Sequence, residues 1–387
     1  MRYKETKFGK IPWDWAVLPV KAVAEVVTDY VANGSFASLA KNVKYKETED
    51  VAILIRLVDY NNGFKNNFVY IDEHAYEFLA KSKLFGDEII ISNVGINVGT
   101  VFRCPHLKYK MSLGPNAIMV RFAGNNDFYY YWLKGFQGQQ MLRSIVTGSV
   151  QPKFNKTNFR DMLVPVPPIV IQNRIVTILN CLDRKIELNN NIIENLEQQA
   201  QTFYQELFIN HANPEWKQGH LSDLIIVRYG KDHKKLADGS VPVFGSGGLM
   251  RKVERPLYDK ESVLIPRKGT LNNVMYINEP FWSVDTMFYT EMKFPNIAKF
   301  VYHFLKSKDL ASMNAGSAVP SMTTDILNTI EIRIPSRDVL ATFENIVSPM
   351  YETMQHCIKE SAKLATIRDS LLPKLMSGEI DVSELQF

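Results

Sequence analysis

Cysteine is scarce in this chain of 387 residues, and its spacing supports no site. The three cysteines, Cys104, Cys181 and Cys357, lie far apart and form no Cys-x-x-Cys pair. This arrangement supports neither a zinc knuckle nor a disulfide framework. Cys181 and Cys357 lie in helical patterns, so we expect both to be buried thiols in a protein of a reducing compartment.

The chain also lacks long hydrophobic runs. No stretch of about 18 apolar residues occurs, so no membrane span is expected. The first residues, Met1 to Glu5, lead into no apolar segment, so no secretory signal is expected. A hydrophobic content of 46% and a charged content of 22% are ordinary for a globular protein. We therefore expect a cytoplasmic protein with no membrane partner.

Motifs that carry chemistry are absent too. No Gly-x-x-x-x-Gly-Lys-[Ser/Thr] occurs, and Gly95 and Gly99 fall in no Gly-x-Gly-x-x-Gly frame. The segment Asn213–Trp216 lacks the second proline of the Asn-Pro-Pro-[Tyr/Phe] motif of amino-methyltransferases. The seven histidines show no His-Glu-x-x-His spacing. These absences predict no catalytic residue and no metal site, and hence a binding or scaffold protein rather than an enzyme.

What the chain does have is an internal repeat. Gly148-Ser149-Val150-Gln151-Pro152 returns 168 positions later as Gly316-Ser317-Ala318-Val319-Pro320, and Pro167 returns as Pro335. The register then holds without a gap through a long helical segment. Two copies are too few for a solenoid, so they predict two similar halves related by an approximate two-fold axis. Such a protein suits a two-part target.

Each copy of the repeat ends in a long helix with an apolar seam. In the first helix the seam alternates steps of four and three over more than four heptads, through Ile175, Leu179, Leu182, Ile186, Asn189, Ile193, Leu196, Ala200, Phe203 and Leu207. The second seam keeps the phase at Met350, Met354, Leu364 and Leu371, although Ser361 and Arg368 interrupt it. Pro349 is expected to kink that helix.

A single helix with such a seam needs a partner, and the other copy is the simplest one. We therefore predict an antiparallel coiled coil. Asn189 would either fix its register at a cost in stability or lie at a solvated edge.

The rest of the chain forms two lobes of mixed structure. The predicted domains are residues 1–165, a first lobe; 166–209, a long helix; 210–335, a second lobe; and 336–387, a second long helix. Strands are predicted at 51–58, 88–91 and 262–265, and helices at 127–143 and 297–305. The fold class is thus α+β. The lobes carry net charges of +6 and +3, whereas the helical segments carry −2 and −3. Positive lobes suit contact with phosphate.

Polar loops with glycine, Arg, Lys and Asn are the candidate DNA contacts. Arg and Lys can pair with guanine edges and Asn with adenine edges, while glycine lets the backbone approach phosphate. For any single residue the alternative is an ordinary solvated loop. The candidates are Arg56, Asn61, Asn62, Asn93, Asn97, Lys153 and Asn155 in the first lobe, and Arg228, Lys231, His233, Ser246, Arg267, Lys268, Asn272 and Asn273 in the second.

Across nearly its whole length the chain resembles the DNA-specificity (S) subunits of type I restriction-modification systems. The resemblance rests on Val166-Pro-Pro-x-x-x-Gln172 with the seam that follows, and on the ending Leu371-Leu-Pro-Lys-Leu-Met-Ser-Gly-Glu-Ile380. In the second copy, Leu340 replaces Gln172 and Ser336 replaces Pro168.

The resemblance implies two target-recognition domains, each reading half of a split double-stranded DNA site, with paired helices between them. It implies two methyltransferase (M) subunits as partners, to which motor-nuclease (R) subunits can add, in a prokaryotic cytoplasm. The cofactor S-adenosylmethionine would be bound by the M subunits, and this chain would bind no cofactor. A coiled-coil scaffold that docks proteins without reading DNA is the alternative.

Overall fold

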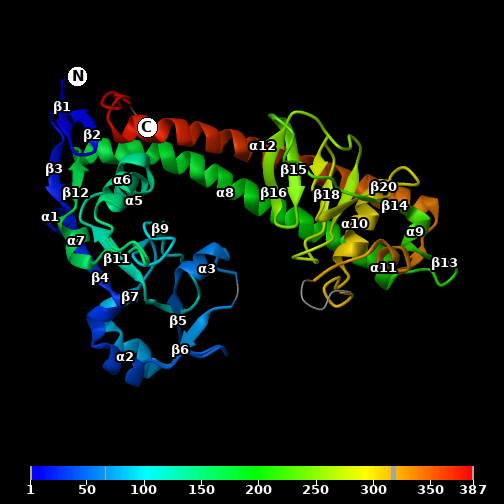
Figure 1. Ribbon diagram of the computed structural model, residues 1–387, viewed down its shortest axis with the longest axis horizontal. Helices are drawn as coiled ribbons and strands as arrows, with labels where there is room; N and C mark the ends of the chain where they lie inside the picture. The colour runs from blue at the N-terminus through cyan, green and yellow to red at the C-terminus, as the bar shows by residue number, and fades with distance from the viewer. Residues whose placement is uncertain (1, 66, 315–319, 386–387) are drawn as a thin grey trace. The chain divides into compact units, whose positions relative to one another are not determined.

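The computed structural model describes residues 2–65, 67–314 and 320–385, and it contains two compact units (Figure 1). One unit comprises residues 1–187 and 361–387, and the other residues 188–360. Each unit therefore holds one lobe and part of both long helices. We call residues 1–165 lobe 1 and residues 210–335 lobe 2. Among the described residues, no helix is long and apolar enough to cross a membrane.

Lobe 1 is built on a four-stranded antiparallel sheet. Its strand order is β4 (Ala24–Asp29), β11 (Ala117–Phe122), β8 (Ile89–Ser92) and β9 (Val101–Arg103). Ile89 and Ile91 face one buried cluster, which includes helix α5 (Asn126–Lys134), and Ile90 faces another. Because both faces of the sheet are covered, β8 is a continuous apolar run rather than an alternating one.

A second sheet covers the far face of the first. Its strand order is β6 (Val69–Ile71), β5 (Ala52–Ile55), β10 (Lys110–Leu113) and β7 (Lys83–Leu84). Most of the additional length of lobe 1 lies between β4 and β8, where the chain also forms η1 (Tyr30–Asn33), α2 (Phe36–Asn42), α3 (Leu57–Asn61), α4 (Glu73–Phe78) and η2 (Ala80–Ser82). The predicted strand 51–58 is therefore too long, because α3 begins at Leu57. The predicted helix 127–143 is two helices, α5 and α6 (Phe136–Ser144), which are separated at Gly135.

Lobe 2 repeats the central sheet with the same strand order. Here β14 (Ile225–Tyr229), β20 (Met287–Met292), β17 (Ser262–Pro266) and β18 (Met275–Ile277) correspond in turn to β4, β11, β8 and β9. Val263 and Ile265 face the cluster that includes helix α10 (Ala298–Lys306), and Leu264 faces the opposite one. A smaller sheet, β16 (Gly248–Val253), β15 (Asp238–Gly245) and β19 (Trp282–Ser283), completes the lobe.

The ends of the two lobes match as well. In lobe 1, β3 (Ala16–Pro19) leads into α1 (Val20–Val23) and pairs with β12 (Leu163–Val166), and α7 (Lys156–Asp161) precedes β12. In lobe 2, β13 (Lys217–His220) leads into α9 (Leu221–Leu224) and pairs with β21 (Glu331–Ile334), and α11 (Thr324–Asn328) precedes β21. The internal repeat thus extends through both lobes. Residues Gly316 to Val319 of its second motif lie outside the described residues.

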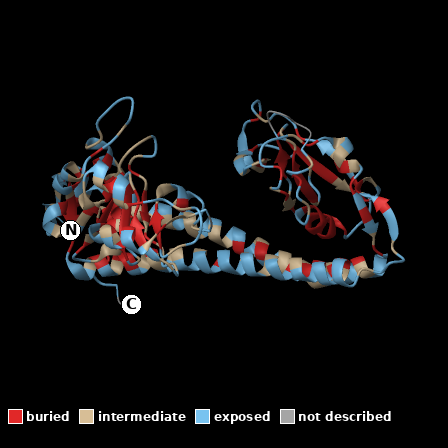
Figure 2. Ribbon diagram, turned by 90° about the horizontal axis from the view of Figure 1, so that it is seen from below, coloured by how far each residue is buried: buried red, intermediate tan, exposed pale blue. Residues whose placement is uncertain are grey.

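The two long helices pack antiparallel within each unit. Helix α8 (Ile169–Gln205) continues into a π-helical turn, η3 (Glu206–Asn210), and α12 (Arg337–Met376) continues through Pro349. In the first unit Ile175 and Leu179 share a cluster with Leu375, and in the second Ala200 shares one with Phe343 and Val347. Figure 2 shows buried positions recurring along the helices among intermediate and exposed ones. Asn189 is fully buried in the seam and donates to Glu360 Oε2 at 2.8 Å.

Two predictions about α8 are wrong. Phe203 is 37% exposed, and Tyr204 is buried in its place together with Phe208. An α-helix has 3.6 residues per turn, so positions seven residues apart drift around the helix by about 20° per heptad. After the four heptads from Ile175 to Phe203, the residue that faces the core is the next one, Tyr204. Cys181 is exposed, whereas Cys104 and Cys357 are buried.

Segments near the two ends of the chain contact each other in the first unit. An N-terminal hairpin, β1 (Tyr3–Thr6) and β2 (Gly9–Pro12), lies against the segment that follows α12, and the Tyr3 hydroxyl donates to the Gly378 carbonyl at 3.1 Å. Gly378 has φ +70°, and a Cβ there would lie 2.4 Å from Pro12 Cγ. Both conditions require glycine at this position of the C-terminal motif.

Candidate nucleic-acid interface

In lobe 1 two glycine-bearing loops are bonded to each other. The first follows β8 and spans residues 93–100, and the second spans 147–154. The Gly95 amide donates to the Pro152 carbonyl at 2.9 Å, and the Phe154 amide to the Asn93 carbonyl at 3.1 Å. Val94 and Lys153 form an antiparallel bridge between these bonds. The second loop contains the repeated Gly-Ser-x-x-Pro motif.

Lobe 2 makes the same bonds at the corresponding positions. The Gly269 amide, in the loop after β17, faces the Pro320 carbonyl at 3.4 Å, and the Met322 amide donates to the Arg267 carbonyl at 2.9 Å. Lys268 and Ser321 form the bridge. Gly95 and Gly269 have φ values of +93° and +86°, which glycine adopts without strain. The described residues therefore show a two-loop device in each lobe, and in lobe 2 the residue of the repeated motif that takes part in it is Pro320. We call this device the loop pair.

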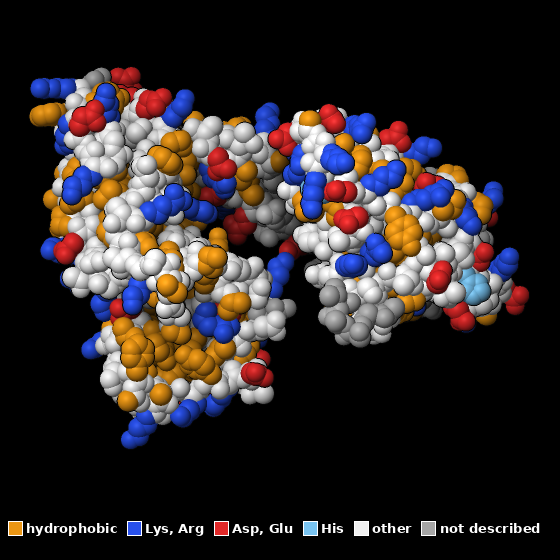
Figure 3. Space-filling model, viewed as in Figure 1, with side chains coloured by type: hydrophobic (Ala, Val, Ile, Leu, Met, Phe, Trp, Pro, Cys, Tyr) orange, Lys and Arg blue, Asp and Glu red, His pale blue; other side chains and the backbone are white. Residues whose placement is uncertain are grey.

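The loop pair of lobe 1 presents Asn97 and Lys153, both exposed. Asn93 is held inside it, because its Nδ2 donates to the Phe154 carbonyl at 3.0 Å. Asn93 also lines an apolar hollow of about 490 Å³ whose rim includes Phe36, 82% exposed, and Tyr45, 54% exposed. Figure 3 shows hydrophobic side chains gathered around α2 on this lobe.

Other candidates in lobe 1 are part of the local framework. Arg56 immediately precedes α3 and donates through Nη2 to the buried Asp59 carboxylate at 2.7 Å. The prediction of a loop from Arg56 to Asn62 is wrong, because residues 57–61 are helical. Asn61 is the last residue of α3, and Asn62 follows it before Gly63 at φ +64°. Asn155 caps α7, where its side chain accepts from the Asn158 amide at 2.7 Å.

In lobe 2 the loop pair meets the β15–β16 turn. Asn273 Nδ2 donates to the Ser246 carbonyl at 2.8 Å. The Arg267 guanidinium lies 5.2 Å from the centroid of the Tyr229 ring, in a cation–π arrangement. Lys268 is exposed. The structure thus brings Ser246, Arg267, Lys268 and Asn273 together.

The remaining lobe 2 candidates lie apart from that group or are engaged in the framework. Arg228 is in strand β14 rather than in a loop, and its Nε donates to Glu291 at 3.0 Å. Asn272 accepts from the Ala311 amide at 2.9 Å and donates to Asp309 at 3.0 Å. Lys231 is exposed, while its carbonyl accepts from Trp282 Nε1 at 2.8 Å. His233, two residues further along the chain, is half-buried.

A polar network joins lobe 1 to the helices. The Tyr131 hydroxyl on α5 donates to Asp183 at 2.6 Å and lies 2.8 Å from Asn180 Oδ1, both on α8. Burial and the neighbouring Asp183 carboxylate raise the pKa of Tyr131 far above its usual value. Arg368 of α12 donates to the same carboxylate at 2.7 Å. Asp183 on α8 therefore binds both lobe 1, through Tyr131, and α12, through Arg368.

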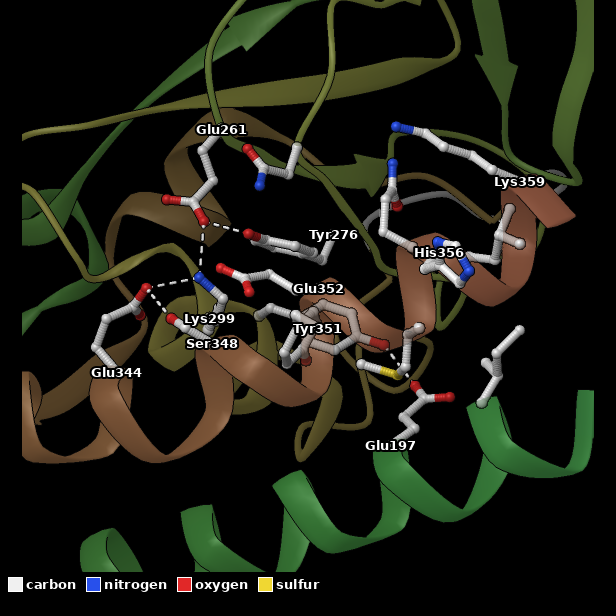
Figure 4. Close-up of a pocket in the computed structure, with 16 residues that line it drawn as sticks. Glu197, Glu261, Tyr276, Lys299, Glu344, Ser348, Tyr351, Glu352, His356 and Lys359 are labelled. Carbon is white, nitrogen blue, oxygen red and sulfur yellow. Dashed lines mark hydrogen bonds and ion pairs between the residues drawn. The ribbon is translucent and has the colours of Figure 1, made fainter. Parts of the chain in front are cut away.

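A corresponding network joins lobe 2 to the helices (Figure 4). Lys299 of α10, with 6% of its side chain exposed, lies between Glu344 of α12 at 2.6 Å and Glu261 at 3.1 Å. The Tyr302 hydroxyl donates to Glu197 of α8 at 2.6 Å. Although burial would raise it, hydrogen bonds from Lys306 and Tyr302 lower the pKa of Glu197. A hollow of about 770 Å³ is lined by Glu197, Glu261, Lys299, Tyr302 and Glu344.

His303 completes the lobe 2 network. Its Nδ1 lies 2.7 Å from Gln201 Oε1 and its Nε2 2.9 Å from the Tyr351 hydroxyl. Burial lowers the pKa of His303 to about 4, because the charged imidazolium would lose its hydration. The ring is therefore neutral at pH 7 and acts as a fixed hydrogen-bonding link.

Sequence reasoning missed these joining residues and the side chains at the tips of the loop pair. Lys299 and His303 within the otherwise largely apolar run Ala298–Leu305 were one available signal for the lobe 2 network. No group of three His, Cys, Asp or Glu residues that could hold a metal ion occurs in the part of the chain that the structure describes.

Comparisons with known proteins agree with this architecture. The family described as the type I restriction modification DNA specificity domain matches residues 12–198 and 213–339, one match for each half. The chain is 23% identical to the type I restriction enzyme MjaIX specificity subunit of Methanocaldococcus jannaschii, over 99% of this chain and 97% of that protein. It is 21% identical to the EcoprrI specificity subunit of Escherichia coli, over 74% of this chain and 79% of that protein.

The fold has a solved counterpart. The crystal structure of a type I restriction-modification S subunit from M. genitalium aligns with a TM-score of 0.59 at 18% identity, and covers 97% of this chain and 99% of that chain. Two family matches that together cover most of the sequence identify the protein: the chain belongs to the type I restriction-modification DNA specificity family.

Proposed function

We propose that this specificity subunit reads a split DNA site, with lobe 1 on one half-site and lobe 2 on the other. The observation that carries the proposal is the loop pair. Its backbone bonds are the same in both lobes, while the residue that follows its glycine differs, Ile96 in lobe 1 and Thr270 in lobe 2. A shared framework with different exposed side chains suits two readers of different sequences.

The proposed contacts divide into two kinds. The loop pairs present exposed Asn97 and Lys153 in lobe 1, and half-buried Arg267 and exposed Lys268 in lobe 2. These side chains can reach base edges and phosphates. Arg56 and Arg228 are already paired with carboxylates, so we assign them to positioning rather than to base readout.

The helices have a separate role in the proposal. Helix α8 runs without a break from one compact unit into the other, so its length would set the unread spacer between half-sites. Leu188 and Ile192 on α8 and Ile358 on α12 are 41–51% exposed. Apolar side chains on a helix surface suit protein contact, and we propose that they help to dock two methyltransferase subunits.

The chain itself is a specificity subunit and not an enzyme. In the proposal, the methyltransferase subunits hold S-adenosylmethionine and methylate an adenine that has been flipped out of the duplex. Motor-nuclease subunits would join the same complex for restriction.

Co-expression tests this function. The chain is produced with the methyltransferase subunit of the same genome in a host without adenine methylation, and the host DNA is read by long-read sequencing. We expect N6-methyladenine in a bipartite motif with a fixed spacer. A continuous motif, or no methylation although the complex assembles, contradicts the proposal. Assembly with partner proteins that lacks the steep salt dependence of phosphate contacts, and that occurs without DNA binding, would instead favour a protein-docking scaffold.

A further inference from the structure

The tips of the lobe 1 loop pair carry two apolar side chains in water. Ile96 is 94% exposed and Val150 is 96% exposed, more than any other large hydrophobic residue that the structure describes. Each lies next to the bonds that join the two loops, since Gly95 donates to Pro152. Single exposed apolar residues are common, but two at the tips of adjoining loops form a surface that suits a partner.

The loops that carry these residues are braced from below. Thr147 and Lys153 exchange two backbone hydrogen bonds of 2.8 and 2.9 Å, which close the second loop beneath Val150. In the first loop the Thr100 hydroxyl donates to the Asn97 carbonyl at 2.9 Å, and the Gly99 amide to the Ser92 carbonyl at 2.8 Å. Both tips are therefore presented by closed turns rather than by long flexible segments.

The charge of the two loops favours DNA over a basic protein surface as the partner. Neither residues 93–100 nor residues 147–154 include a carboxylate, and Lys153 is exposed beside the tips. Phosphates on either side of a base step would meet no repulsion there. Ile and Val are branched at Cβ and stiff about χ1, which suits a short wedge.

We propose that Ile96 and Val150 form an apolar wedge that enters the base stack of the half-site read by lobe 1. Proteins that distort DNA use apolar side chains of this kind to part a base step, and the contact made by the bent duplex compensates for the lost stacking. The proposal rests on the proposed function, because it needs lobe 1 to bind DNA.

Lobe 2 has no equivalent wedge on its first loop. The position of Ile96 is taken by Thr270, and the apolar residues that follow, Leu271 and Val274, are 2% and 3% exposed. The two half-sites should therefore be distorted differently, which supplies an internal control.

The test uses the full complex of this chain with its methyltransferase subunits. The variant combines Ile96→Ser and Val150→Ser; a matched control is Val51→Ser, which removes an exposed valine elsewhere in lobe 1. A second variant, Ile96→Val with Val150→Ile, keeps the apolar character. Duplexes that contain the methylated motif carry 2-aminopurine at successive positions of each half-site, and affinity and fluorescence are measured.

We expect wild-type complex to raise the fluorescence at one step of a single half-site, away from the methylated adenine. The double serine variant should lose that signal and bind at least about 10-fold more weakly, while the Val51→Ser and Val/Ile variants keep both. Equal fluorescence and affinity in wild type and the serine variant overturn the wedge alone. Loss of complex assembly in the serine variant shows that the tips dock protein, which also overturns it. Wild-type complex that binds no split site contradicts the proposed function itself.

Discussion

The boundary between the two compact units crosses both long helices, each at one position. Residues can therefore be inserted there to lengthen the helix pair without changing the contacts inside either unit. The boundary falls between Glu187 and Leu188 in α8 and between Glu360 and Ser361 in α12. The perturbation inserts four residues at each position, copies of residues 184–187 and 357–360. The Asp183–Arg368 ion pair stays within the first unit and the Asn189–Glu360 hydrogen bond within the second.

Helix geometry gives the expected size of the effect. Four residues add about 6 Å and turn the chain about 40° beyond a full turn in the right-handed sense. One base pair of B-DNA adds about 3.4 Å, and a turn of about 10–10.5 base pairs corresponds to roughly 35° per pair. One added base pair matches the rotation and two match the translation. The proposed spacer should therefore lengthen by one or two base pairs.

Seven inserted residues make a discriminating comparison. They preserve the heptad seam and add about 10.5 Å, which is close to three base pairs, but they turn the helix about 20° in the opposite sense. Three base pairs require about 100° of right-handed rotation, so we expect methylation to be lost. The assay is the methylome of cells that express each variant with the methyltransferase subunit. Unchanged spacers, altered half-site sequences, or equal behaviour of the four- and seven-residue insertions would refute the reasoning.

Three further predictions concern the residues that hold the lobes to the helices. Tyr204→Ala should lower the free energy of unfolding, measured in urea, by about 3–5 kcal/mol, and Phe203→Ala by less than about 1 kcal/mol, because only Tyr204 is buried. A larger loss for Phe203→Ala than for Tyr204→Ala would show that the heptad seam continues through Phe203. Lys299→Met should lower the free energy of unfolding by about 3–5 kcal/mol, because Glu261 and Glu344 lose their buried partner. The control is Lys260→Met, which changes an exposed lysine. Similar urea midpoints for the two variants would show that the network contributes little to stability. His303 has a pKa of about 4 in the folded chain, below its value of about 6.5 in the unfolded chain. Its contribution to the free energy of unfolding is therefore complete above pH 6.5, and up to about 3 kcal/mol of it is lost as the pH falls from 6.5 to 4. His303→Gln should flatten the pH dependence of thermal unfolding in that window, and parallel curves for variant and wild type would contradict the lowered pKa of His303.

Local patterns predicted the larger elements of this fold. The β-branched run at Ile89–Ile91 gave a buried strand, and the seam from Ile175 onward gave a long helix. The heptad template then failed at Phe203, because it imposes a seven-residue period that this helix does not keep to its end. Helix α3 was missed because five residues carry no periodic pattern, and its start depends on the contact between Arg56 and Asp59.

The candidate interface was harder to predict for a physical reason. The loop pair depends on bonds between residues that are far apart in sequence, such as Gly95 and Pro152, and no local pattern specifies them. The repeated proline of the Gly-Ser-x-x-Pro motif was visible, but the hydrogen bond that its carbonyl accepts from the neighbouring loop was not. Loop composition likewise cannot distinguish Lys153, which is exposed, from Arg228, which is paired with Glu291.

An exchange of lobe 2 tests the central claim most directly. Residues 210–335 are replaced by the corresponding segment of a related specificity subunit, and the new adenine methylome is read with the same methyltransferase partner. We expect one half of the bipartite motif to change while the other half and the spacer stay the same. If both halves change, or if neither half changes although the chimaera methylates DNA, the two lobes do not read separate halves of the site.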